Sequence, residues 1–306
     1  MIRFDKYKRA EKKDYCFTFI IPTWNNLKYL ELCVNSIRKN SAYEHQIIIA
    51  VNEGVDGTFQ WVENQSLDYI YAKENIGICY ALNACRSLID TKFVFYANDD
   101  MYFLPNWDVP ILERINQLTD NQNDTHKYFM ISSTLVEPAG NNPCVVHKDF
   151  GADIENFREA DLLKEKDNLC RSDWRGSTWP PNVMPLDCWD LVGGMSVEFH
   201  PGWYSDPDIS RKLWHAGVRD FIGVGNSLVY HFGSKSTKRM RKNPGKKMFQ
   251  LKWGVSPGAF TRHYLRRGDA DFTEVEEDKL PEPNNIKQLI KRIFACFGNK
   301  KNKLLT

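Results

Sequence analysis

The chain has 306 residues, of which 42% are hydrophobic and 13% aromatic, enough for a sizeable core in one large domain or two smaller ones. Its 41 Lys and Arg residues nearly balance 39 Asp and Glu residues, so overall charge gives no reason to expect a nucleic-acid partner. The charged N-terminus lacks the apolar core of a secretion signal, and no run is long and apolar enough to cross a bilayer. Eight scattered cysteines without a CxxC pair fit free thiols in a reducing compartment. We therefore expect a cytoplasmic protein, either soluble or peripheral on the cytoplasmic face of a membrane.

The first 130 residues alternate apolar strands with amphipathic helices. Strands are expected at 16–24, 45–51, 67–72 and 92–97, and helices at 27–37, 75–89 and 105–118. This order predicts an α/β fold with a mostly parallel, Rossmann-like sheet flanked by helices on both faces. Ligands of such sheets bind outside the carboxyl ends of the strands, so the polar residues that follow each strand should converge on one site.

Two adjacent carboxylates, Asp99 and Asp100, follow the strand at 92–97 directly. One interpretation is a plain turn, because Asn, Asp and Pro are common turn formers. The other is a site for a hard divalent cation with oxygen ligands, which would neutralise the charge of a departing diphosphate. The spacing alone does not separate these two interpretations.

The later part of the chain is less regular. Residues 138–182 are mostly loop with a short helix near 154–166, and order resumes with segments 187–195 and 202–217, a strand at 220–232 and helices at 246–254 and 257–268. Pro281 and Pro283 indicate a linker before a final helix with an apolar and a basic face. That helix predicts peripheral contact with an anionic membrane; the alternative is a helix packed on the rest of the chain or on a partner. We divide the chain into residues 1–130, 131–270 and 271–306.

An ordered set of short motifs resembles glycosyltransferase family 2. The motifs are "FTFIIPTWNN", "IIIAVNEGVDGT", "ENIGICYALN", "FVFYANDDM", "LVGGM", "WYSDPDISRKLWHAG" and "VYHFGSKST", and with the later "FQLKWG" they cover about residues 16–255. The resemblance implies a GT-A fold, with a nucleotide-sugar-binding half before residue 130, an acceptor-binding half up to residue 270 and C-terminal helices. It also implies a nucleoside-diphosphate sugar donor carrying UDP, dTDP or GDP.

The resemblance assigns residues to the donor and the metal. The nucleotide or sugar would be bound by Pro22, Thr23, Asn25, Asn52, Glu53, Asn75, Gly77, Asn83, Asn98 and Asp99. Gly77 would let the backbone approach the donor closely. Asp100, with His231 completing the site, would bind Mn²⁺ or Mg²⁺. The chain departs from the family pattern at Asn52, in a loop one residue short, and at Asn98, which removes one charge.

The same resemblance makes Asp206 the catalytic base, because an inverting transfer needs a carboxylate to take the proton of the acceptor hydroxyl. The alternative is that Asp206 or Asp208 caps the following helix. Ser205 stands where the family usually has Glu. Trp174, in the irregular segment, is expected to stack on an acceptor sugar, although most tryptophans are core residues. The basic loop around residues 235–247 would close over the diphosphate, or be a solvated or nucleic-acid-binding loop.

These observations predict a metal-assisted inverting glycosyltransferase that acts on a hydroxyl of a glycan or a lipid-linked acceptor in polysaccharide biosynthesis at the cell envelope. The departures at Asn52, Asn98 and Ser205 keep open a non-catalytic glycan- or nucleotide-binding module with a degenerate site. A nucleotidyltransferase would ordinarily have a Gly-rich loop after the first strand, which "PTWNNLKYL" lacks. No nucleic-acid partner is expected.

Overall fold

The computed structural model describes residues 2–9, 13–119, 128–233, 239, 242–273, 275–281 and 286–297. The strands are β1 (Asp5–Tyr7), β2 (Thr18–Trp24), β3 (Gln46–Asn52), β4 (Asp68–Ala72), β5 (Phe93–Tyr96), β6 (Met101–Phe103), β7 (Phe129–Glu137), β8 (Val145–His147), β9 (Trp174–Arg175), β10 (Asn182–Pro185) and β11 (Asp220–His231). The helices are α1 (Leu27–Asn40), α2 (Thr58–Asn64), α3 (Gly77–Cys85), α4 (Asp108–Thr119), α5 (Glu159–Lys164), α6 (Lys166–Leu169), α7 (Leu186–Leu191), α8 (Ser205–His215), α9 (Gly245–Trp253), α10 (Pro257–Ala259) and α11 (Ile286–Phe297).

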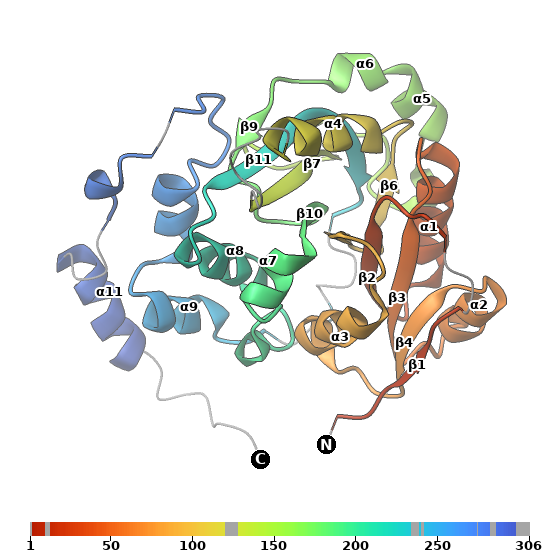
Figure 1. Cartoon of the computed structure of the whole chain (residues 1–306), viewed down its shortest axis with the longest axis horizontal. Coiled ribbons are helices and arrows are strands. Elements are labelled where there is room, and N and C mark those ends of the chain that lie inside the picture. The colour runs from red at the N-terminus through yellow and green to blue at the C-terminus, as the bar shows by residue number, and fades with distance from the viewer. Residues whose placement is uncertain are drawn as a thin grey trace.

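One sheet runs through both halves of the chain, in the strand order β1-β4-β3-β2-β5-β10-β7-β11-β6 (Figure 1). Strands β2 to β5 are parallel to one another, as the alternation of strands and helices predicts. The second half joins this sheet through β10, which lies antiparallel between β5 and β7. The two halves therefore share a single hydrogen-bonded sheet.

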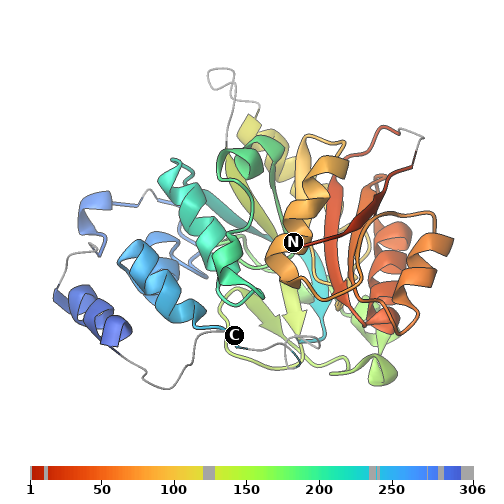
Figure 2. The same ribbon diagram turned by 90° about the horizontal axis from the view of Figure 1, so that it is seen from below.

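Helices cover both faces of the parallel strands, because successive side chains of a strand point to opposite faces. Ile21 of β2 and Ile49 of β3 pack against α1, α2 and α4, whereas Ile20 and Ile48 pack against α3, α7 and α8. Figure 2 shows α1 and α2 on one side of the strands β2 to β4 and α3 on the other. Each of these isoleucines is fully buried, which stabilises the fold by about 1.5–3 kcal/mol per side chain.

The predicted strands and helices of the first half are present in the predicted order, but the sequence did not reveal β7. Its centre carries hydroxyl side chains, which an apolar pattern does not identify as a buried strand. The hydroxyls are satisfied internally: Ser132 Oγ lies 2.6 Å from Ser177 Oγ, and Thr134 Oγ1 donates to the carbonyl of Val224 at 2.8 Å. Hydrogen bonding of this kind removes most of the cost of burying polar groups.

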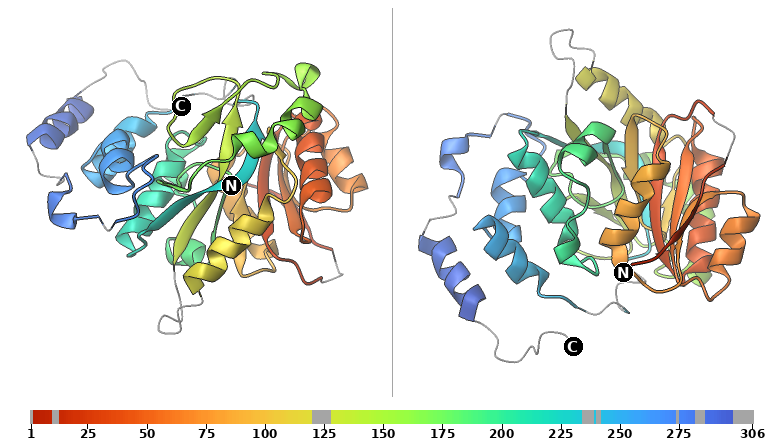
Figure 3. Two further views of the ribbon diagram at one scale, coloured as in Figure 1. Left: turned by 90° about the horizontal axis from the view of Figure 1, so that it is seen from above. Right: turned by 60° about the horizontal axis from the view of Figure 1, so that its bottom comes forward.

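The C-terminal elements lie beside α8. Helix α9 packs next to α10 and its π-helical continuation (Phe260–Tyr264), and α11 lies against α9 at the rim of the molecule (Figure 3). Among the described residues, no helix has the length and apolar character needed to traverse a bilayer.

Candidate active site

A cavity of about 580 Å³ lies where the parallel strands end, at the edge of the sheet to which ligands are expected to bind. It is bounded by the ends of β2, β3, β5 and β11, by the loop before α3 and by the N-terminus of α8. Ten of the predicted site residues line it: Pro22, Thr23, Asn52, Asn75, Gly77, Asn98, Asp99, Asp100, Asp206 and His231.

At one end of the cavity, short polar side chains fix the loops that follow the strands. Thr23 Oγ1 donates to Asp99 Oδ2 at 2.7 Å, which ties the tip of β2 to the tip of β5. Asn52 Oδ1 accepts from the backbone N–H of Ile76 at 2.9 Å. These bonds hold the ends of three neighbouring strands in one fixed arrangement around the cavity.

Gly77 begins α3 at a point where two distant segments meet. Its φ of +71° is a conformation that favours glycine, and an added Cβ would lie 2.4 Å from His200 Nδ1 and 3.0 Å from Pro201 Cα. The next residue, Ile78, donates its backbone N–H to the carbonyl of Pro201 at 2.9 Å. The segment 199–204, which we call the strap, is thereby held against the start of α3 at the edge of the cavity.

Asn25 and Glu53 do not line the cavity but support its rim. Trp24 Nε1 and Asn25 Nδ2 both donate to Glu53 Oε2, at 2.9 and 2.8 Å. Asn25 Oδ1 in turn accepts from the backbone N–H of Val55 at 3.0 Å. Arg239 lies over the Trp24 ring at 4.8 Å and donates to the Trp24 carbonyl at 2.7 Å. Arg239 is the one residue described within 234–241, so the predicted closing of that loop stays a prediction.

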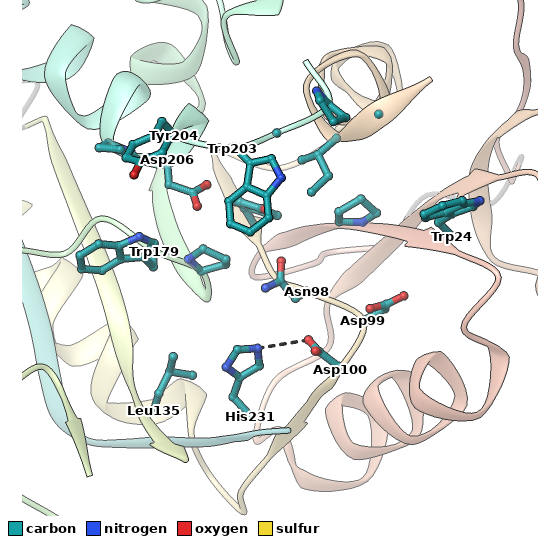
Figure 4. Close-up of a pocket in the computed structure, with 18 of the residues that line it drawn as sticks. Trp24, Asn98, Asp99, Asp100, Leu135, Trp179, Trp203, Tyr204, Asp206 and His231 are labelled. Carbon is teal, nitrogen blue, oxygen red and sulfur yellow. Dashed lines mark ion pairs between the residues drawn. The ribbon is translucent and has the colours of Figure 1, made fainter. Parts of the chain in front are cut away.

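Acidic groups crowd the wall formed by β5, β7 and β11. Figure 4 shows Asp99 and Asp100 beside His231, which pairs with Asp100. His231 Nε2 lies 3.3 Å from Asp100 Oδ1, and its Nδ1 lies 2.7 Å from Glu137 Oε1. Burial alone would lower the pKa of His231, but the two carboxylates outweigh it and raise this pKa to about 10. Burial and the charge of Asp100 raise the pKa of Asp99 to about 7.

Asp206 faces this wall from the opposite side. It lies in the first turn of α8, and Figure 4 shows it pointing into the cavity beside Trp203. Burial raises its pKa to about 7, because the charged carboxylate has lost much of its hydration. Neither Asp206 nor Asp208 caps α8, whose N-cap is Tyr204. Asp208 is fully buried and instead accepts from Trp253 Nε1 at 2.7 Å.

Besides Asn25 and Glu53, two further predicted binding residues, Asn83 and Trp174, lie outside the cavity. Trp174 is only 4% exposed and donates through Nε1 to Thr134 Oγ1 at 2.8 Å. Its ring covers Gly223 so closely that an added Cβ there would lie 1.8 Å from it. Asn83 exchanges two hydrogen bonds of 2.8 Å with the backbone of Met195. Trp174 is therefore a core residue and not an acceptor platform, and Asn83 fixes a loop.

The structure adds site residues that the sequence did not identify. Glu137 ends β7 and lines the cavity, as Asn98, Asp99 and Asp100 do after β5. The sequence does place this acid directly after the run "FMISSTLV", but the hydroxyl residues in that run kept it from being predicted as a strand. Trp179 and Trp203 line the cavity, which Trp174 does not, and Arg267 lies 5.4 Å from the Trp179 ring centre.

The residues that surround the cavity can be compared with known proteins. A family model described as "Glycosyl transferase family 2" matches residues 18–143, which hold Thr23, Asn52, Gly77 and Asp100. The matched segment therefore resembles a family 2 glycosyltransferase domain. The resemblance drawn from the motifs is thus confirmed over this segment. No curated protein sequence matches the chain.

Similar solved structures confirm the GT-A fold. Residues 1–349 of S. aureus TarS align with a TM-score of 0.52 and 12% identity, over 91% of this chain and 79% of that one. The same TarS fragment in complex with UDP-GlcNAc aligns with a TM-score of 0.52 and 14% identity, over 91% of this chain and 79% of that one. GalNAc-T7 with UDP, GalNAc and Mn²⁺ aligns with a TM-score of 0.54 and 13% identity, over 81% of this chain and 50% of that one.

No metal cluster is preformed in the part of the chain that the structure describes: no three His, Cys, Asp or Glu side chains are grouped to hold an ion. The chemistry of the wall nevertheless fits a divalent cation. Carboxylate oxygens of Asp99 and Asp100 and an imidazole nitrogen of His231 face one cavity, and these donors suit Mg²⁺ or Mn²⁺. The imidazole of His231 lies directly beside the Asp100 carboxylate.

Proposed function

We propose that this protein is a metal-assisted, inverting glycosyltransferase that takes its sugar from a nucleoside-diphosphate sugar. The observation that carries the proposal is the position of Asp206. Asp206 lies on α8 and faces, across the cavity, the polar ends of the strands β2, β3 and β5. A donor bound at those tips would present its anomeric carbon toward a carboxylate on the opposite side, which is the arrangement that inversion requires.

The donor would bind at the end formed by Thr23, Asn52 and Gly77. Asn52 and Thr23 offer polar groups to a ribose or a base, and the missing side chain of Gly77 leaves backbone accessible. Neighbours of this fold have been solved with UDP, UDP-GlcNAc and, in GalNAc-T7, with Mn²⁺. These structures support a UDP-sugar as the first donor to test, ahead of dTDP- and GDP-sugars.

Asp206 would act as the base of the transfer. As the acceptor hydroxyl oxygen forms its bond to the anomeric carbon, the hydroxyl proton passes to an Asp206 carboxylate oxygen. The bond from that carbon to the diphosphate oxygen breaks at the same time, and the electron pair leaves with the diphosphate. A base with a pKa of about 7 is well matched to this proton transfer at neutral pH.

Asp100 and His231 would hold Mn²⁺ or Mg²⁺, with Glu137 orienting the imidazole through its Nδ1. When bound, the ion supplies positive charge to the departing diphosphate. Asp99 is tied to Thr23 by its 2.7 Å hydrogen bond, which keeps it on the donor side of the wall.

The acceptor would enter beside Trp203 and Trp179. Trp203 Nε1 is buried and has no hydrogen-bond partner among the described residues, so it can donate to a sugar hydroxyl. Tryptophan faces also stack on the apolar faces of sugar rings. We propose a glycan or lipid-linked acceptor for this end of the cavity, with the surface polysaccharides of a cell envelope as its source.

The proposal is tested by release of nucleoside diphosphate from UDP-, dTDP- and GDP-sugars, with and without Mn²⁺, together with donor-induced shifts in melting temperature. We expect one nucleotide class to give both a shift and turnover. Absence of a shift with every donor and metal would overturn the proposal.

Asp206→Asn provides the sharper test because two effects of opposite sign are expected. Turnover should fall about 10²–10⁴-fold, since the base is lost while donor binding is kept. Stability at pH 8 should rise. The pKa of Asp206 is higher in the folded state than in the unfolded state, so its contribution to stability is present at low pH and is lost as pH rises through about 7. Removing the charge should recover roughly 1–2 kcal/mol, discounted because the side chain lines an open cavity.

The matched control is Asp187→Asn on the exposed face of α7. It should change neither turnover nor melting temperature. Full activity of Asp206→Asn would remove this residue from the mechanism, and a loss of activity accompanied by a loss of stability would indicate a structural role instead.

A further inference from the structure

Helix α11 exposes a continuous apolar stripe. Five large side chains lie three or four positions apart along it, and between 45% and 74% of each is exposed: Ile286, Leu289, Ile290, Ile293 and Phe294. Spacing of this kind places them on one face of a helix. Monomeric proteins rarely leave such a group of large apolar side chains uncovered by any partner.

The helix is attached to the protein by its other face. Of the described α11 side chains, only Arg292 and Ala295 are partly covered; Ala295 lies opposite the stripe and Arg292 lies beside its edge. Helix α11 lies against α9, at the rim of the molecule in both views of Figure 3. An amphipathic helix of a water-soluble fold ordinarily turns its apolar face to the core, and α11 does the reverse.

The charge of this region indicates what covers the stripe. Residues 286–306 contain six basic residues and no acidic one. Helix α9 adds the exposed Lys246 and an apolar side chain, Leu251, that is 38% exposed. A stripe of apolar residues flanked by cations complements an anionic lipid surface, where acyl chains accept the stripe and headgroups pair with the lysines and arginines.

Of these two helices, α9 adjoins the proposed acceptor side of the cavity. Asn243, just before α9, donates to the carbonyls of Phe199 and His200 in the strap at 2.7 and 2.9 Å. Gly245 abuts the carbonyl of Trp203, since an added Cβ would lie 2.3 Å from it. Within α9, Lys252 pairs with Asp208 of α8 at 3.0 Å. Residue Asn243 and helix α9 together therefore connect to the strap that holds Trp203 and to the helix that holds Asp206.

We propose that α11, together with Leu251 of α9, docks on an anionic membrane surface and holds the acceptor side of the cavity beside the lipid headgroups. The choice of a membrane-anchored acceptor as substrate rests on the proposed function, whereas the docking itself does not. This surface distinguishes the protein from an enzyme that meets its acceptor in solution.

Docking is measured by co-sedimentation of the full chain with vesicles of phosphatidylcholine alone or phosphatidylcholine mixed with phosphatidylglycerol. We expect binding to the mixed vesicles that weakens with added salt. Leu289→Asp should weaken it about tenfold or more, because an apolar anchor is lost and an anion is added. Lys291→Glu should weaken it about fivefold or more on anionic vesicles.

The matched control is Leu191→Asp on α7, where the leucine is 56% exposed but lies on another helix. It should bind vesicles as the wild type does. Light scattering of wild type and Leu289→Asp tests the rival that a second copy covers the stripe. A dimer that Leu289→Asp dissociates would overturn the proposal, as would equal binding of Leu289→Asp and wild type or no vesicle binding at all.

Donor-induced melting shifts and turnover on a water-soluble acceptor separate this inference from the proposed function. Leu289→Asp should leave both unchanged. Intact turnover without vesicle binding would contradict only the proposed docking surface. Vesicle binding without any effect of a donor would contradict only the proposed glycosyltransferase function.

Discussion

At the scale of single residues, the cavity is organised by two ionisable groups in opposite surroundings. Asp206 is half-buried, and no nearby group compensates its charge, so desolvation raises its pKa to about 7. His231 is more deeply buried, yet Asp100 and Glu137 favour its charged form and raise its pKa to about 10. One wall therefore carries a carboxylate ready to accept a proton, and the other a cation held between two acids.

The pKa of Asp206 predicts the pH profile of the wild type. Because the base works only when deprotonated, kcat/KM should fall about tenfold per pH unit below 7 and level off above it. The residual activity of Asp206→Asn should lose this inflection. A profile that stays flat from pH 5.5 to 8, or an inflection that persists in the variant, would contradict the assignment; the second result would point to Asp99.

Glu137→Gln tests the predicted metal site. The change keeps the size of the side chain but weakens the partner of His231 Nδ1, which lies 2.7 Å away. We expect the concentration of Mn²⁺ needed for half-maximal activation to rise about 10–100-fold, as when other partners of metal-binding histidines are removed. Glu155→Gln, at an exposed Glu paired with Lys28, serves as the control. Unchanged activation in Glu137→Gln would exclude a role for His231 in metal binding.

At the scale of secondary structure, strand tips were predictable and loop contacts were not. Pro22, Thr23 and Asn52 lie at the ends of apolar strands and Asp100 lies just after one, and the parallel arrangement brings such positions to one edge of the sheet. The sequence favoured Trp174 as the acceptor residue because Trp174 lies in the irregular segment, whereas Trp203 lies in the more regular segment 202–217. Only the fold decides which of them packs on Gly223 and which enters the cavity.

Gly77→Ala tests the contact between α3 and the strap. Gly193→Ala is the matched control. The φ of Gly193 is +70°, against +71° at Gly77, and a Cβ added at Gly193 would have no atom within 4 Å. Both substitutions should cost about 1–2 kcal/mol of stability through the left-handed conformation. Gly77→Ala should cost about 1–3 kcal/mol more, through the clash with His200 and Pro201, and should raise the donor KM. Equal losses and equal KM values would show that the strap moves freely.

At the scale of the whole molecule, the two halves are one structural unit and α11 is an attachment to it. The sheet passes from β5 through β10 to β7, so neither half completes its own sheet. This could not be deduced from the sequence, because the apolar pattern of "NVMP" in β10 is too short to predict a central strand. The motifs nevertheless located both sides of the cavity, since Asp206 and the tips of β2, β3 and β5 all belong to them.

A chain ending at Pro281 should therefore unfold in urea as the full chain does, in one transition seen alike by tryptophan fluorescence and far-ultraviolet circular dichroism. Its free energy of unfolding should change by no more than about 0.5 kcal/mol, because the apolar stripe of α11 is exposed and contributes little to the core. Were the stripe packed inward, losing five large apolar side chains would cost several kcal/mol. A loss of that size would show that α11 is part of the core, and two separate transitions would show that the halves fold independently.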